Sequence, residues 1–269
     1  MSVIPSAPSG APRSPEPTEA SGPTEAPEPT EASEPSGPAD GSAAVEPAGP
    51  VLRSPVGMAT ALSVLLVLAT VVALPQLLAD YRLYASLTAF IDDGPTSATM
   101  SGYAAAARFA SIASSLALFA QLPTAVLFLV WFHQVRVNAG VFAPEGFGRG
   151  TRWAVGCWFI PIGHLWLPFK TATEIWGASA QAAPDGSWRR VSYGPVVAWW
   201  ATWAGSHLLQ VVANRLGASD SATVLRTSMT VSFAADLLFL ASGVLAVRFV
   251  RGLTAMQYAK ATQGPNALV

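Results

Sequence analysis

Long apolar runs without a lysine or arginine dominate this chain and restrict what it can fold into. A helix needs about twenty apolar residues to cross the hydrocarbon core of a bilayer. Four stretches reach that length: residues 56–78, 109–132, 194–213 and 229–247. Charged residues make up only 12% of the chain, about half of what soluble domains carry. We therefore expect an all-α transmembrane helical bundle with these four stretches as its spans.

A fifth apolar stretch, residues 153–169, is short for a span and is interrupted by Pro161 and Pro168. If it crosses the membrane and the N-terminus is cytoplasmic, six of the fourteen basic residues in 51–269 lie inside. If it enters and leaves on one side, ten of them do. Because cytoplasmic loops are enriched in lysine and arginine, the charges favour four spans, both termini in the cytoplasm and a re-entrant or interfacial segment. The alternative is five spans with the C-terminus outside.

The residues after this segment have the pattern of an amphipathic helix. Between residues 169 and 179, Lys170 and Glu174 lie four apart on one face, and apolar residues recur at helical spacing on the other. Such a helix is expected to lie in the plane of the lipid headgroups, with its tryptophan at the interface. The apolar residues are Phe169, Ala172, Ile175 and Trp176.

The N-terminal residues 1–50 differ from the rest in composition. They hold one base, eight acids and twelve of the twenty-two prolines, and a Pro-Thr-Glu-Ala unit recurs in them. Such a segment has too little apolar surface to offset the entropy lost on ordering. We expect a disordered, acidic, Pro/Glu-rich tail, a transmembrane helical domain at 51–260 and a short C-terminal tail at 261–269.

Tryptophan and proline form a distinctive pattern in the proline-broken segment and the helix after it. Segments 131–139, 199–203 and 251–257 fit the same pattern. Together they resemble a bacterial multi-pass membrane family catalogued as domain of unknown function 4328, over about residues 55–260. The resemblance implies a membrane protein and supplies no activity; His164 stands where the family usually has asparagine. The signature residues are Trp158, Pro161, His164, Trp166, Pro168, Glu174 and Trp176.

Ionisable side chains inside the predicted spans mark a candidate polar site, because such groups are costly in lipid. Asp236 lies seven residues into the fourth span, and His207 lies seven residues before Asn214 at the end of the third. In the four-span topology both lie about 10 Å below the outer face, and Gln210 shares a helix face with His207. Two interpretations are open: a proton- or ion-responsive site, or interhelical hydrogen bonds that stabilise the bundle.

Other polar and aromatic residues admit structural explanations. His164 either lines a pocket with Asn138 or Glu174 or hydrogen-bonds a carbonyl freed by a proline. Several tryptophans are expected to form an aromatic belt at the membrane surface rather than a cofactor site. These are Trp131, Trp153, Trp166, Trp176 and Trp188.

Catalytic motifs are missing from the sequence. Three scattered histidines and the single Cys157 make no recognisable metal set, so we expect neither an enzyme nor a cofactor. The expected partners are the lipid bilayer and a second copy or another membrane protein, and no nucleic acid. The first hypothesis is a multi-pass cell-membrane protein acting as scaffold, sensor or accessory subunit. The alternative is an oligomeric transporter or channel-like component that uses His207 and Asp236. A lipid-modifying enzyme is a third, weaker reading.

Overall fold

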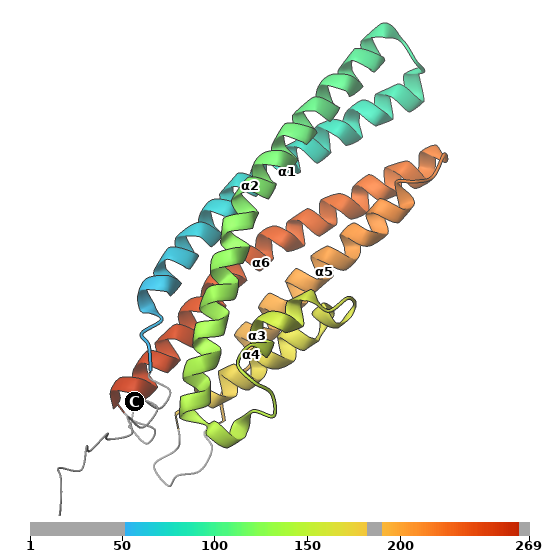
Figure 1. The fold of residues 1–269 in the computed structure, drawn as a ribbon. Coiled ribbons are helices and arrows are strands. Elements are labelled where there is room, and N and C mark those ends of the chain that lie inside the picture. Colours follow the sequence, from blue (N-terminus) through green and yellow to red (C-terminus); the bar gives the residue numbers. More distant parts are fainter. Residues whose placement is uncertain (1–51, 182–189, 264–269) are drawn as a thin grey trace, which may run out of the picture. The chain divides into compact units, whose positions relative to one another are not determined.

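The computed structural model describes residues 52–181 and 190–263, and these residues fold into helices with no strand among them (Figure 1). The all-α prediction is confirmed. The expectations for residues 1–50, for Trp188 and for the last six residues lie outside the described part of the chain. The long helices are α1 (Val56–Asp93), α2 (Ser97–Phe142), α5 (Gly194–Leu216) and α6 (Ala222–Gln263).

Each of the four predicted spans lies within one of these long helices. By length and hydropathy, α1, α2 and α6 are able to cross a membrane; among the described residues these three meet both conditions. Helix α5 has 23 residues but carries His207, Gln210 and Asn214, and it does not belong to that group. Helix α2, with 46 residues, is about 70 Å long. It therefore extends well beyond a hydrocarbon core of about 30 Å.

The long helices form two antiparallel hairpins, α1 with α2 and α5 with α6 (Figure 1). The turn of the first hairpin contains Gly94 at a φ of 77°, a conformation that favours glycine. Thr96 then caps α2: its hydroxyl accepts from the Thr99 backbone N–H, and the Thr99 hydroxyl accepts from the Thr96 N–H. The hairpins meet where α1 packs on α6. There, a methyl group added to Gly243 would overlap the Thr70 hydroxyl, so the small residue permits the close approach.

Residues 153–169 do not form one continuous helix. They comprise α3 (Trp153–Gly156) and two 3₁₀ turns, η2 (Cys157–Phe159) and η3 (Gly163–Leu165), and they lead into α4 (Leu167–Ala178). Ile162, between the two 3₁₀ turns, has a φ of 61°, which lies outside the helical region. Continuous helix is what a membrane span requires. The segment is thus broken at the place where its prolines predict a break.

Both ends of this segment lie beside the C-terminal part of α2. Before it, the Arg149 carbonyl accepts from the Arg136 guanidinium at 2.7 Å. After it, Ser179 Oγ accepts from the Gln257 amide, which also donates to the Val135 carbonyl. The segment therefore enters and leaves at one end of the helical unit, the end where α1 begins and α2 and α6 finish. We call this the terminal end; which side of a membrane it faces stays a prediction.

Helix α4 has the predicted amphipathic pattern, but its apolar face packs on protein rather than on lipid. Ile175 and Trp176 are buried, whereas Lys170 and Glu174 are exposed. The expectation that the apolar face of this helix rests in the headgroup plane is wrong, because α2, α5 and α6 supply the surface that buries it. Lys260 Nζ donates to the carbonyls of Ala178 and Ala180, and so closes the C-terminal end of α4.

Candidate functional site

An aromatic core fills the terminal half of the helical unit. Trp131 is fully buried and Trp176 is 5% exposed, so their assignment to an interfacial belt is wrong. Trp199 stacks on Phe249 with ring centroids 4.6 Å apart. Trp158, from the proline-broken segment of residues 153–169, meets Trp200 and Trp203 edge to face. These signature tryptophans therefore stabilise the packing of the segment on the helices. Trp166, 53% exposed, is at the surface as expected.

Four segments meet at the terminal end in a hydrogen-bond network, which we call the terminal network. It joins the side chains of Asn138, Ser179 and Gln257 to the backbone of Arg53. The Asn138 amide nitrogen donates to the Arg53 carbonyl (2.8 Å) and to Gln257 Oε1 (3.1 Å). The Gln257 amide nitrogen donates to the Val135 carbonyl (2.8 Å) and to Ser179 Oγ (3.1 Å). All amide hydrogens of Asn138 and Gln257 are thus used within the protein. The network is structural and offers a ligand no donor.

His164 lies in η3, half-buried, between the two signature prolines. Its ring forms no hydrogen bond to Asn138, to Glu174 or to a freed carbonyl within residues 52–181 and 190–263. Asn138 is instead held in the terminal network, and Glu174 lines a shallow pocket with Arg149 and Lys170. The structure therefore does not assemble either arrangement proposed for His164 from the sequence.

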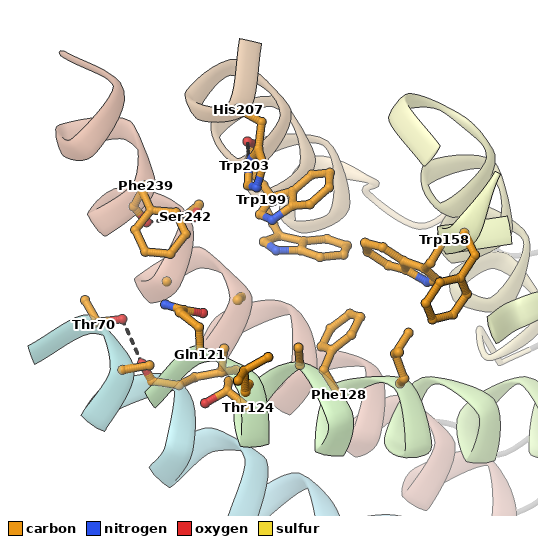
Figure 2. A pocket seen from close by; sticks show the side chains of 18 residues that line it. Thr70, Gln121, Thr124, Phe128, Trp158, Trp199, Trp203, His207, Phe239 and Ser242 are labelled. Atoms are coloured by element: carbon orange, nitrogen blue, oxygen red, sulfur yellow. Dashed lines mark hydrogen bonds between the residues drawn. The ribbon is translucent and has the colours of Figure 1, made fainter. Parts of the chain in front are cut away.

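A cavity of about 420 Å³ lies between the two hairpins, and we call it the inter-hairpin pocket. Figure 2 shows side chains from all four long helices and from the proline-broken segment turned toward this one space. Its wall is mostly aromatic and aliphatic. The aromatic members are Phe128, Trp158, Phe159, Trp199, Trp203 and Phe239.

The few polar side chains of the inter-hairpin pocket are mostly satisfied by their own helices. The hydroxyls of Thr70, Thr124 and Ser242 donate to the carbonyls of residues 66, 120 and 239 at 2.7 Å each. Such local bonds leave methyl and methylene groups to face the cavity. The pocket is therefore apolar in effect, although its wall includes hydroxyl residues.

His207 lines the inter-hairpin pocket and does not pair with Asp236. Its Nδ1 donates to the Trp203 carbonyl at 2.8 Å, and its ring lies 4.3 Å from the Trp203 ring. Because a carbonyl only accepts, Nδ1 carries a proton and Nε2 is the remaining acceptor of the neutral ring. Asp236 lines a different cavity together with Gln210. Of the three residues predicted to form one site, the structure brings Gln210 and Asp236 together and leaves His207 apart.

The second cavity, of about 350 Å³, is bordered by carboxyl, amide and hydroxyl groups, and we call it the polar cavity. Asp80 of α1 and Asp236 of α6 both line it. Gln76 donates to Asp80 at 2.9 Å. Asp236 Oδ2 is buried and has no hydrogen-bond partner. The remaining polar wall residues are Ser114, Gln121, Gln210 and Ser232.

Asp80 is the functional candidate that sequence reasoning missed. It lies two residues beyond the first predicted span, so it was not counted among the ionisable side chains inside the spans. The sequence did contain a signal for Asp80: Gln76 and Asp80 lie one helical turn apart, so both project from one face of the helix. No group of three or more histidine, cysteine, aspartate or glutamate side chains is positioned to hold a metal ion in the described ranges.

Comparison with known proteins identifies one relationship. A family model described as "Domain of unknown function (DUF4328)" matches residues 95–255. The match runs from the turn before α2 into α6 and includes the proline-broken segment, which confirms the resemblance seen in the tryptophan–proline pattern. No curated protein and no solved structure matches the chain.

Proposed function

This chain belongs to the family described as a domain of unknown function (DUF4328), and on that premise we propose that it is a membrane-embedded binding protein, a sensor or accessory subunit. In this proposal the inter-hairpin pocket holds an apolar ligand. The observation that carries the proposal is the pocket itself: about 420 Å³, walled by three tryptophans and three phenylalanines. Ligand sites in proteins have this size and this apolar character.

The inter-hairpin pocket has an entrance on the lipid-facing side. Two residues of its wall, Leu122 and Phe159, are 56% and 71% exposed in the helical unit. Leu122 lies on α2, which is long enough to cross a membrane, and an exposed apolar side chain on such a helix is expected to face lipid. A ligand therefore reaches the pocket from within the bilayer, and an acyl or alkyl chain is the simplest occupant.

Retention of a ligand is favoured over its passage through the protein. Toward the terminal end the pocket is followed by the aromatic core, where Trp131, Phe132 and Phe249 are fully buried. The terminal network then closes that end. A transporter or channel-like oligomer is the second candidate, and the polar cavity with Gln210 and Asp236 supports it. In such a transporter or channel, Asp80 would take the place beside Asp236 that the sequence analysis gave to His207.

Saturable quenching of tryptophan fluorescence tests the binding proposal. Bromododecane quenches tryptophans that it touches, and Trp158, Trp199 and Trp203 line the pocket. In nanodiscs of unbrominated lipid, the native protein should show a saturable component, and Ala125→Trp, which fills the pocket, should abolish that component. Val126→Trp, at the neighbouring position outside the wall, should retain it. Quenching that rises linearly in all three proteins would refute the proposal.

We further propose that the terminal end faces the cytoplasm of the cell that carries this protein in its membrane. Basic residues gather there, among them Arg53, Arg136 and Arg149, and lysine and arginine favour the cytoplasmic side. In a Cys157→Ala background, the test uses single cysteines at Gly150 and at Asp220. The Gly150→Cys protein should react only after a membrane-impermeant reagent is admitted to the cytoplasm, and the Asp220→Cys protein should react from outside. Labelling of both from one side would exclude this topology.

A further inference from the structure

The inter-hairpin pocket and the polar cavity are neighbours. Gln121 of α2 and Phe239 of α6 belong to the walls of both. The two cavities therefore follow one another along α2 and α6, and each of these helices lines both cavities. The apolar part lies nearer the terminal end, beside Trp158, and the polar part lies nearer the hairpin turns, beside Asp80. A ligand that fills both would be apolar at one end and polar at the other.

The charge of the polar cavity is negative and is not balanced by its own wall. Asp80 and Asp236 line it, and no lysine or arginine belongs to the described wall. The nearest bases on α1 and α6 have other partners: Arg82 lies 5.1 Å from the Phe109 ring centre, and Arg226 pairs with Asp92. Carboxyl groups in a low-dielectric setting are costly unless a cation or a proton compensates them.

Two polar groups in the wall of the polar cavity have no hydrogen bond or only long ones. Asp236 Oδ2 is buried and accepts no hydrogen bond. The Gln210 amide makes only long contacts, 3.3 Å to Asn214 and 3.4 Å to Ser232. Contacts of that length are weak and are readily exchanged. This cavity therefore presents an acceptor and an adjustable amide, in contrast to the fully used amides of the terminal network.

We propose that the two cavities form one site for an amphiphilic cation, a molecule with an ammonium-type head and an apolar body. The head lies in the polar cavity beside Asp80 and Asp236, and the body lies in the inter-hairpin pocket beside Phe239, Trp203 and Trp158. The proposal rests on the proposed function, since it needs the inter-hairpin pocket to accept an apolar group. It goes further by assigning the ligand a positive charge and the two carboxyl groups the role of recognising it.

Two nearly isosteric probes isolate the effect of charge. Dodecyltrimethylammonium is a cation, and dodecyldimethylamine N-oxide is its neutral counterpart with the same chain. Each is used below its micelle concentration to displace bromododecane from the native protein in nanodiscs, with recovery of tryptophan fluorescence as the readout. The cation should displace bromododecane at about tenfold lower concentration than the N-oxide, because only the cation gains from the carboxyl pair.

Substitutions then assign the effect to the carboxyl pair. Asp236→Asn and Asp80→Asn should each remove the preference for the cation and leave displacement by the N-oxide unchanged. Asp93→Asn, an exposed carboxyl of α1 outside both walls, should keep the preference. Equal displacement by both probes in the native protein, or a preference that survives both substitutions, would overturn the inference. If bromododecane itself shows no saturable quenching, the proposed function fails first, so the two failures are distinguishable.

Discussion

The two halves of the helical unit use the same kinds of side chain in opposite ways. At the terminal end, Gln257 and Asn138 are 1% and 2% exposed, and every hydrogen of their amides is bonded within the protein. In the polar cavity, Gln210 makes only long hydrogen bonds and Asp236 leaves one oxygen without a partner. A fully satisfied polar network fixes a structure, whereas a partly satisfied one is the place where a ligand can bind.

The aromatic side chains show the same contrast. Trp131, Phe132 and Phe249 pack on one another and leave no exposed surface. Trp203 and Phe159 instead border a cavity, and Phe159 is largely exposed. Because protein interiors are normally close-packed, a cavity walled by aromatic side chains is suited to ligand binding rather than to stability.

The largest effect is expected from the terminal network. Gln257→Ala removes the hydrogen bonds that this amide makes to the Val135 carbonyl, to Ser179 and to Asn138, so each of these buried groups loses one of its partners. It should lower the free energy of unfolding by about 2–4 kcal/mol. Thermal unfolding of the purified protein in detergent measures this. A loss below about 1 kcal/mol would mean that the terminal network does not hold the helices together.

The matched substitution in the polar cavity should have a much smaller effect. Gln210→Ala removes an amide whose contacts are long, so it should change the free energy of unfolding by less than about 1 kcal/mol. The same thermal measurement applies. A loss as large as that of Gln257→Ala would remove the distinction between a structural end and a binding end. Weaker binding of dodecyltrimethylammonium to the Gln210→Ala protein, with stability retained, would support the distinction between a structural end and a binding end.

The sequence was sufficient for those features that depend on local patterns. The apolar runs give α1, α2, α5 and α6, because a helix satisfies its own backbone in an apolar setting. Pro161 and Pro168, together with the sorting of basic residues, indicate a segment that turns back, and the structure breaks the helix there. The amphipathic pattern of α4 was also readable, since it depends only on spacing of 3.6 residues per turn.

The neighbours of each helix were not predictable in the same way. His207 and Asp236 match in depth, but pairing also depends on how each helix is rotated about its axis, and α6 turns Asp236 toward Asp80 of α1. Tryptophan is typical of an interfacial belt, which is why Trp131 and Trp176 were assigned to one. Both are buried, because α4 and α6 pack around them. Long-range packing therefore decided both the site and the core.

A structure of the protein determined with a bromine-labelled alkylammonium ion tests the central claim most directly. We expect a bromine signal inside the inter-hairpin pocket, beside Trp158 and Trp203, and the ammonium group beside Asp80 and Asp236. Bromine found only on the outer, lipid-facing surface of the helices, with both cavities unchanged, would contradict it.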